Sequence, residues 1–334
     1  MNNNIDKAFK HAIKNKQIVL SSIILGLAVV FIFSLEEQGN AKVSTEPLQK
    51  EEFVVQEQEN ITQPIDFRPE QYAQTDSIIY EKSMGERVAC EGNETGSAVT
   101  VTDDIGQRKV DVPVLMYHYI EAAGSTTLPW LYEPPEIFEK QLKTLYNKCY
   151  NSIFVSDLGK SIADGSQLPV KSIALTFDDG YEDMYTNAFP LLKKYDMKGT
   201  MYIIVNALDK PGYLTKEQVK EMADSGYVEI AAHTLNHPDL RHKDWQVANY
   251  EIGGSKRELE NIIGKPVTDF AYPYGFFTVR DEEICRQAGY LTCASTYPGQ
   301  VQTYAERFSL YRLRPGFRVG SALLSWLELA GPKR

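Results

Sequence analysis

Cysteine and histidine are both scarce in this chain of 334 residues. The cysteines number only four, too few for a disulfide scaffold, and their spacing matches no zinc-finger pattern. Two of them, Cys285 and Cys293, could pair in an oxidising compartment, and buried free thiols are an equal alternative. The histidines number only five, so the placement of three of them at the ends of predicted strands is unusual.

Positive charge is also limited. The net charge is -10, the isoelectric point is near 5.2, and no basic cluster lies outside the first residues of the chain. Proteins that bind nucleic acid need a basic surface to neutralise phosphate groups. This composition therefore argues against nucleic acid, and against anionic polymers in general, as partners.

Long apolar runs are absent except for one, at residues 17–35. Lysines precede the run and Glu36 and Glu37 follow it, so the positive-inside rule orients it with the lysines in the cytoplasm. Its length is close to the lower end of what crosses a bilayer. We expect residues 1–16 to be a cytoplasmic basic segment and residues 17–35 to be a transmembrane signal-anchor helix. The small residues around Ala41 leave cleavage and secretion as the alternative.

Residues 36–108 have little apolar periodicity. They are rich in Glu, Gln, Thr and Asn, which is typical of a solvated chain that cannot bury a core. We expect a disordered extracytoplasmic tether here. The remaining residues, 109–334, are enough for one barrel-sized domain.

Two acidic residues follow a predicted core strand. The apolar run 171–177 ends at Asp178 and Asp179, and Gly180 permits a sharp turn after them. Charges at the end of a buried strand are costly unless they are paired or bind a metal. Because successive strand residues face opposite sides, the two carboxylates should have different roles. Capping of the following helix is the structural alternative.

Two histidines follow another predicted strand. The run 227–232 leads into His233, and His237 lies four residues later in a turn. Two imidazoles and one carboxylate from a different strand match the three-ligand, open-position pattern of catalytic metal sites. We therefore predict one divalent metal ion held by His233, His237 and one of the two carboxylates, Asp178 or Asp179.

The predicted elements alternate between strand and helix, which indicates an α/β fold with a parallel sheet. Candidate chemistry at the carboxyl ends of several strands is typical of a (β/α) barrel. With about seven strands, we expect a distorted or incomplete (β/α)7-type barrel. The predicted strands are 112–117, 171–177, 199–205, 227–232, 267–271, 290–295 and 311–319. The predicted helices are 137–148, 184–195, 215–225, 245–263 and 279–288.

Three segments resemble the first three motifs of the polysaccharide deacetylases, also called the NodB homology domain or carbohydrate esterase family 4. They are Thr176-Phe-Asp-Asp-Gly180, His233-Thr-Leu-Asn-His237 and Phe270-Ala-Tyr-Pro-Tyr-Gly275. The resemblance is most recognisable over residues 171–320 of the 109–334 domain. It implies that Asp178 is the general base and that Asp179, His233 and His237 bind the metal.

Two positions depart from the usual family pattern. The third motif normally carries an arginine that orients the base, and Ala271 stands there, so Arg314 and Arg280 are candidates to replace it. The usual C-terminal histidine, the general acid, is missing as well. A circularly permuted branch, which includes the poly-N-acetylglucosamine deacetylases of biofilm formation, has this histidine ahead of the first motif. Leu115-Met-Tyr-His118 resembles that element, which implies that His118 is the acid.

The resemblance implies hydrolysis of N-acetyl groups on an extracellular N-acetylated polysaccharide, releasing acetate. Poly-N-acetylglucosamine is favoured, with peptidoglycan and chitin-like chains as other substrates. We expect zinc, although cobalt, nickel and iron accept the same ligands. Residues Tyr272, Pro273, Tyr274 and Gly275 would form the oxyanion and substrate region. Tyr272, Tyr274, Trp130 and Trp326 are candidates for stacking on sugars, although packing in the core is the commoner role of such aromatic residues.

Three other functions fit part of the pattern. A two-histidine, one-carboxylate iron oxygenase has the same ligand set, but it leaves Asp178 without a role. A catalytically silent glycan-binding protein on the same fold would explain Ala271 and the missing C-terminal histidine. A glycosidase that uses Asp178 and Asp179 as its carboxylate pair is disfavoured, because adjacent residues rarely reach the required separation.

Overall fold

The computed structural model describes residues 99–100, 106, 108–124 and 128–330. The predicted cytoplasmic segment and signal-anchor, and nearly all of the predicted tether, lie outside these residues. Within the described part of the chain, no helix is both long and apolar enough to cross a membrane.

Seven strands form one parallel sheet in the described residues. The order is β3-β5-β6-β7-β8-β9, and β4 pairs with β5. Most of these strand residues are buried, as expected for a parallel sheet covered by helices. The strands are β3 (Val114–Tyr117), β4 (Asn151–Ile153), β5 (Ser172–Phe177), β6 (Gly199–Ile203), β7 (Val228–Ala232), β8 (Asp269–Ala271) and β9 (Thr292–Ala294).

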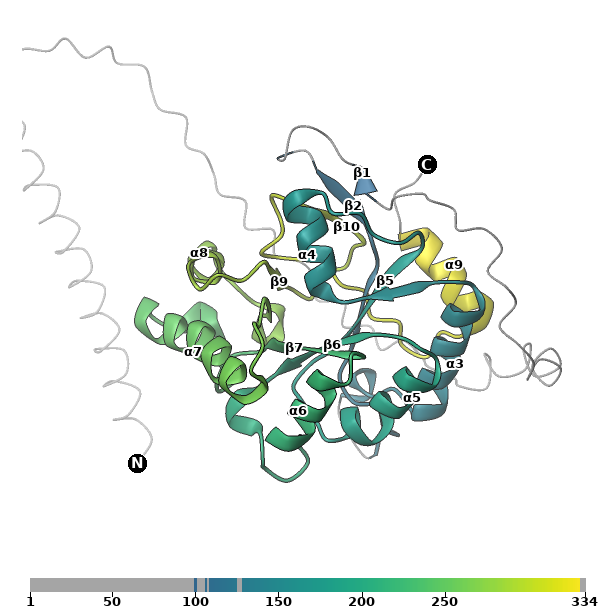
Figure 1. Cartoon of the computed structure of the whole chain (residues 1–334), viewed down its shortest axis with the longest axis horizontal. Coiled ribbons are helices and arrows are strands. Elements are labelled where there is room, and N and C mark those ends of the chain that lie inside the picture. Colours follow the sequence, from purple (N-terminus) through teal and green to yellow (C-terminus); the bar gives the residue numbers. More distant parts are fainter. Residues whose placement is uncertain (1–98, 101–105, 107, 125–127, 331–334) are drawn as a thin grey trace, which may run out of the picture. The chain divides into compact units, whose positions relative to one another are not determined.

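Helices follow the strands and cover the outside of the sheet (Figure 1). Each of the five predicted helices is present, although the start of the 184–195 helix is a π-helix, η4 (Met184–Ala188), before α5 (Phe189–Lys194). Two helices, α4 and α9, were not predicted. The other helices are α3 (Pro135–Asn147), α4 (Val155–Asp164), α6 (Lys216–Asp224), α7 (Trp245–Ile263), α8 (Val279–Gln287) and α9 (Gly320–Ala330), with short 3-10 turns η3 (Pro129–Leu131), η5 (Val205–Ala207), η6 (Leu240–His242) and η7 (Pro273–Gly275).

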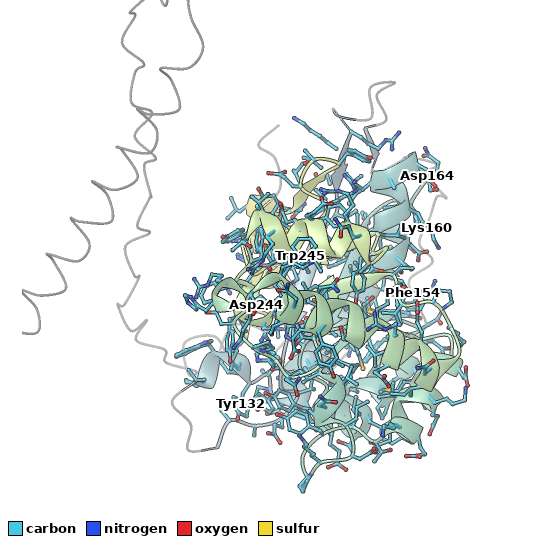
Figure 2. The ribbon with its side chains drawn as sticks, turned by 90° about the vertical axis from the view of Figure 1, so that its left-hand side faces the viewer. Tyr132, Phe154, Lys160, Asp164, Asp244 and Trp245 are labelled. Carbon is cyan, nitrogen blue, oxygen red and sulfur yellow. The ribbon has the colours of Figure 1, made fainter. Side chains whose placement is uncertain are left out.

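Side-chain caps explain where the predicted helices begin. The Thr215 hydroxyl accepts a hydrogen bond from the Gln218 backbone N–H at 3.1 Å, which confirms Thr215 as the N-cap of α6. Asp244 does the same for α7, where its carboxylate accepts from the Val247 N–H at 2.8 Å. Figure 2 labels Asp244 and the first residue of the helix, Trp245. These local signals are readable in sequence, so the starts of these helices were predicted correctly.

The predicted strand at 311–319 is wrong. The chain at and just before the start of this segment instead makes isolated parallel bridges, Leu310 to Ala294 at the end of β9 and Leu313 to Leu115 in β3. The Leu313 N–H donates to Val114 O at 2.8 Å, and the Met116 N–H donates to Leu313 O at 2.9 Å. The segment thus lies between the two edge strands without forming a regular strand. The result is an α/β half-barrel of parallel strands.

A small antiparallel sheet accompanies the half-barrel and was not predicted. It has the order β1-β2-β10, comprising β1 (Val99–Thr100), β2 (Lys109–Asp111) and β10 (Val301–Thr303). The main apolar core lies between the strands and the outer helices and includes Leu175, Met201 and Phe270. This packing fixes the strand ends, and the polar residues that follow them collect at the carboxyl edge of the sheet.

Candidate metal and catalytic site

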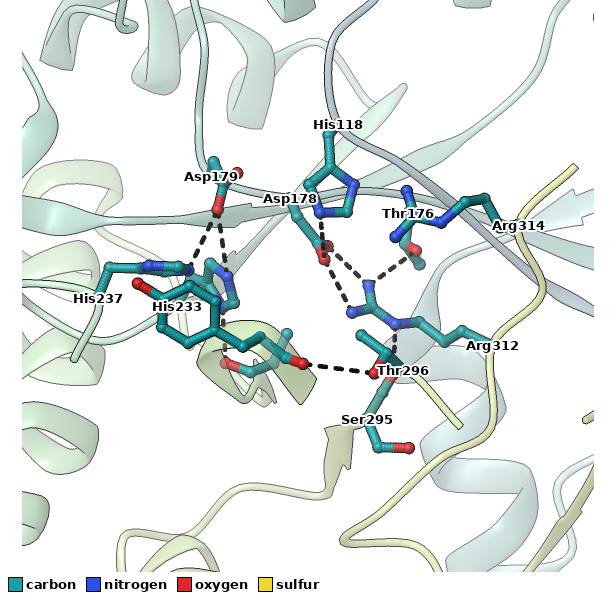
Figure 3. A network of polar contacts seen from close by, with 12 residues as sticks. His118, Thr176, Asp178, Asp179, His233, His237, Ser295, Thr296, Arg312 and Arg314 are labelled. Atoms are coloured by element: carbon teal, nitrogen blue, oxygen red, sulfur yellow. Dashed lines mark hydrogen bonds and ion pairs between the residues drawn. The ribbon is translucent and has the colours of Figure 1, made fainter. Parts of the chain in front are cut away.

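Three side chains form a cluster that could hold a metal ion. Asp179, His233 and His237 each offer a ligand atom, and these atoms lie within 4.8 Å of one another. Both histidine Nε2 atoms converge on the same oxygen, Asp179 Oδ1, at 3.3 Å and 3.4 Å (Figure 3). Carboxylate and imidazole ligands in this number suit zinc and neighbouring divalent ions. The residues present therefore fit the predicted metal.

The backbone around the cluster is held in uncommon conformations. Asp179 and His237 both have positive φ angles, 78° and 57°, which L-residues adopt rarely. Positive φ at non-glycine residues is costly and gathers at functional sites. The turns at the ends of β5 and β7 thus aim the carboxylate and the second imidazole at one point.

The tautomer of His233 is also set for metal binding. Its Nδ1 donates to the carbonyl of Ala271 at 2.7 Å, so in the neutral ring Nε2 is unprotonated and faces Asp179. Burial would lower the pKa of His233, but the hydrogen bond that the protonated ring gives Asp179 through Nε2 raises it overall, so a metal ion would take the place of that proton. Burial lowers the pKa of His237 to about 4, which keeps that ring neutral and able to bind a cation.

Asp178 lies beside the cluster and is held by an arginine. Arg312 donates through two nitrogens to the two carboxylate oxygens of Asp178, at 2.6 Å and 2.8 Å. A further bond from Arg312 Nε to Ser295 O, at 2.8 Å, fixes the guanidinium from behind. Burial would raise the pKa of Asp178, but the charge of Arg312 holds it well below its usual range. Asp178 therefore stays ionised, as a base must.

This ion pair corrects the expectation for the missing arginine. Arg280 instead pairs with Asp281 at 2.8 Å and donates to backbone carbonyls. Arg314 donates to the Trp130 carbonyl at 3.4 Å. The residue that orients Asp178 is Arg312, two positions before one of the two candidates. Spacing alone could not identify Arg312. Arg312 and Arg314 are two positions apart, so both would point to the same face of the strand that was expected at 311–319.

His118 reaches the site from the end of β3. Its Nε2 lies 3.8 Å from Asp178 Oδ2, the oxygen that also accepts a hydrogen bond from Arg312 (Figure 3). Among the described residues, its buried Nδ1 has no hydrogen-bond partner. Burial lowers the pKa of His118, against the opposing charges of Asp178 and Asp179. The structure thus brings His118 close to Asp178, and its role as the general acid stays a prediction.

The segment Tyr272–Gly275 is divided between the core and the site. Tyr272 is fully buried, and its hydroxyl donates to Phe308 O at 2.9 Å, so the expectation that it stacks on sugar is wrong. Tyr274 is 57% exposed and lies edge-on to His237, with ring centroids 4.6 Å apart. Gly275 is required at its position, because a Cβ there would meet Thr296 atoms at 2.1–2.6 Å. Pro273 is buried at the start of this turn.

The two tryptophans expected to contact sugar differ in position. Trp130 is 57% exposed, and its carbonyl accepts the hydrogen bond from Arg314. Trp326 packs partly buried against the core, with the Arg318 guanidinium 4.9 Å from its ring centroid. Only Trp130 keeps a largely accessible ring. Cys285 and Cys293 are both free and buried, so the alternative in which they pair is not observed.

One residue that sequence reasoning missed supports the metal-ligand loop. Glu251, buried on α7, accepts from the backbone N–H groups of Leu235 and Asn236 at 3.0 Å and 2.9 Å. It also accepts from the Asn236 side chain at 2.8 Å. Leu235 and Asn236 lie between His233 and His237 in sequence. Glu251 thus fixes the loop that carries both imidazoles, and its helical position gave no signal of this.

Comparison with known proteins agrees with the geometry. A family model described as polysaccharide deacetylase matches residues 165–293. YxkH of Bacillus subtilis (strain 168), whose name places it among the polysaccharide deacetylases, is 31% identical over 224 residues, covering 66% of this chain and 78% of that protein. The chain belongs to the polysaccharide deacetylase family, whose members are hydrolases. This membership removes the iron oxygenase and glycosidase alternatives.

Two further similarities concern a solved structure and a glycan-specific enzyme. The Streptococcus pyogenes deacetylase PplD, solved in complex with acetate, has a TM-score of 0.61 and 28% identity, covering 67% of this chain and 99% of that chain. The poly-beta-1,6-N-acetyl-D-glucosamine N-deacetylase of Staphylococcus epidermidis is 30% identical over 131 residues, covering 35% of this chain. This chain spans 45% of the length of that relative.

Proposed function

We propose that this protein is a metal-dependent hydrolase that removes N-acetyl groups from an extracellular N-acetylglucosamine polysaccharide and releases acetate. The single observation that carries the proposal is the placement of an arginine-held carboxylate, Asp178, directly beside the Asp179, His233 and His237 cluster. A base next to a cation site is the minimum that amide hydrolysis by water requires.

Each residue has a role that its surroundings support. Asp178 is ionised and accepts the proton of the attacking water. His118, whose Nε2 lies 3.8 Å from Asp178 Oδ2, gives a proton to the departing amine nitrogen, which leaves poorly unless it is protonated. A carboxylate held ionised by a cation and an imidazole have the unlike pKa values that an acid and a base need.

The metal would be held by Asp179, His233 and His237. When bound, a divalent ion lowers the pKa of water and polarises the acetyl carbonyl. Zinc is our first expectation, with cobalt, nickel or iron accepted by the same donors. The backbone around Tyr274, where φ is 61°, would supply an oxyanion donor near His237.

The proposed substrate is poly-β-1,6-N-acetylglucosamine, with peptidoglycan and chitin-like chains as the alternatives. Support comes from the position of His118 ahead of the first motif and from the similarity to the staphylococcal enzyme. A neutral glycan also suits a chain with a net charge of -10. We further propose that residues 17–35 anchor the enzyme with its catalytic domain outside the membrane, or direct its secretion if they are cleaved.

The alternative of a catalytically silent glycan-binding protein has lost much of its support. It was suggested by Ala271 and by the missing C-terminal histidine. Arg312 binds the Asp178 carboxylate as an orienting arginine would, and His118 lies 3.8 Å from the same carboxylate. Acetate release separates the two functions directly.

The test is acetate release by the full chain on a panel of N-acetylated glycans, with and without a chelator. We expect chelator-sensitive release that zinc or cobalt restores. Asp178→Asn and His118→Ala should each lower kcat by at least about 100-fold, because each removes one proton transfer. A chelator-insensitive enzyme, or full activity of Asp178→Asn, would refute the proposal. Unchanged turnover by His118→Ala would refute only the role of His118.

A further inference from the structure

The imidazole of the proposed general acid has no side-chain partner that orients it. His118 Nδ1 is buried without a hydrogen-bond partner among the described residues. Its Nε2 lies 3.8 Å from Asp178 Oδ2, which is too far for a hydrogen bond. A catalytic histidine is usually held by a hydrogen bond at the ring nitrogen that does not react. The position of this imidazole is therefore set by the backbone that carries it.

The backbone just after His118 is bound to the segment that follows Asp178. The Ile120 N–H donates to Asp183 Oδ2, and Asn187 Nδ2 donates to Ile120 O at 2.8 Å. Both backbone polar groups of Ile120 are thus held by two side chains four positions apart. Ile120 is fully buried, so water does not compete for these two bonds.

The two side chains belong to an uncommon helix. Asp183 directly precedes the π-helix η4, and Asn187 lies within it. π-Helical turns are rare and are frequent at functional sites. Asp183 is buried, and its Oδ1 has no hydrogen-bond partner among the described residues. Burying a carboxylate in this way costs stability, so the contribution of Asp183 lies in the bond that Oδ2 accepts from Ile120.

A stacked pair of rings joins the same two segments. Tyr119, which directly follows His118, stacks on Tyr181 with ring centroids 3.8 Å apart and ring planes at 18°. Tyr181 comes directly after the turn that carries Asp178 and Asp179. Stacked rings fix how far apart the segments are, but they do not fix their register. The directional hydrogen bonds at Ile120 set that register.

We propose that Asp183 and Asn187 are positioning residues that set the distance from His118 to Asp178 by holding Ile120. The inference rests on the proposed function, in which His118 is the general acid. It adds two residues that control proton transfer to the leaving group without touching the substrate. Displacing a catalytic group by about 1 Å can cost about 100-fold in rate, so a shift of the backbone at Ile120 should be visible in kcat.

The test uses substrates whose leaving groups differ in their need for a proton. A 4-nitrophenolate leaves unaided, whereas an ethoxide or an amine leaves poorly unless it is protonated. The full chain is assayed on 4-nitrophenyl acetate, phenyl acetate, ethyl acetate and the β-1,6-linked trimer of N-acetylglucosamine. In Asp183→Ala and in Asn187→Ala, kcat for ethyl acetate and for the trimer should fall about 10- to 100-fold with KM unchanged. Hydrolysis of 4-nitrophenyl acetate should change less than about two-fold.

Two further variants show whether the bonds at Ile120 are responsible. Asp183→Asn keeps an oxygen that can accept from the Ile120 N–H, so it should retain kcat for ethyl acetate within about three-fold. Asn249→Ala makes the same change as Asn187→Ala at an exposed position of α7 and should alter no rate. If Asp183→Ala does not fold, Asn187→Ala, at a half-buried position, carries the test.

Equal losses on all four substrates would show that Asp183 and Asn187 only support the fold, and the proposal would be wrong. The same follows if both alanine variants keep full activity on ethyl acetate and on the trimer.

A double-variant comparison separates this inference from the proposed function. His118→Ala removes the acid, so adding Asn187→Ala should lower ethyl acetate hydrolysis by less than about two-fold more. That result in a protein that releases no acetate from any glycan would overturn the proposed function and support the positioning role. Acetate release from glycans, with the two substitutions acting independently on ethyl acetate, would do the reverse. A protein inactive on esters and glycans alike would overturn both.

Discussion

Arg312 and Asp178, which are 134 residues apart in sequence, form a buried ion pair with two hydrogen bonds of 2.6 Å and 2.8 Å. Arg312 is 1% exposed and Asp178 is 2% exposed. A guanidinium matches a carboxylate at two points, whereas an ammonium is a single point charge. The pair therefore fixes both the charge and the orientation of the proposed base.

Replacing Arg312 tests this pairing. Arg312→Lys keeps the charge but loses the two-point geometry, so we expect kcat for acetate release to fall at least about ten-fold. Arg312→Ala leaves Asp178 buried and unpaired, and it should lower the free energy of unfolding by about 3–5 kcal/mol. Denaturant unfolding and acetate assays measure the two effects. Equal activity in Arg312→Lys would show that orientation by Arg312 is not needed.

The pKa of His118 provides a pH test. Burial lowers it, and the charge of Arg314 lowers it further. A general acid must be protonated, so activity is lost as pH rises through that pKa. Arg314→Met should therefore raise the pKa of His118 and move the alkaline side of the kcat/KM profile to higher pH. Arg257→Met, the same change at an exposed position, should not move it. A profile unmoved by Arg314→Met would show that another group is the acid.

Glu251 should control metal affinity without touching the metal. Glu251→Gln replaces one acceptor oxygen by a donor and cannot accept all the bonds that Leu235 and Asn236 make. Because residues that orient metal ligands typically affect binding 10- to 100-fold, we expect the zinc Kd to rise at least about ten-fold. Titration against a chromophoric chelator measures it, with the exposed Glu258→Gln on the same helix as control. If Glu251→Gln binds zinc as tightly as the unaltered protein, Glu251 contributes only to the packing of α7 and not to metal affinity.

Two carboxylates, those of the half-buried Glu229 and the fully buried Asp269, should make stability depend on pH. Burial raises the pKa of Glu229 from 4.5 to about 8, with a further contribution from Asp269, whose own pKa burial raises to about 6. The folded state thus holds protons that the unfolded chain releases, so the free energy of unfolding falls as pH rises from about 5 to about 8. Glu229→Gln should reduce that fall by roughly 1–2 kcal/mol, measured by urea unfolding across this range. If the free energy of unfolding falls equally with pH in Glu229→Gln and in the unaltered protein, the raised pKa does not belong to Glu229.

Local pattern was enough for much of the fold. The runs before Asp178 and His233 are apolar and short, and each forms a buried parallel strand, β5 and β7, as predicted. Thr215 caps its helix as predicted, because capping depends on residues within one turn. The prediction of a strand at 311–319 was wrong. The chain here makes only isolated bridges to β9 and β3, and such contacts cannot be predicted from the local sequence.

Strand ends and family motifs, both readable along the chain, were enough to predict the candidate metal cluster, because parallel strands bring their carboxyl ends to one edge and two of those ends lead into Asp179 and His233. The arginine that holds Asp178 and the glutamate that holds the histidine loop could be identified only from the packed fold. Those contacts join an irregular segment and a helix to the site, and their geometry depends on how whole elements pack rather than on the spacing of residues along the chain.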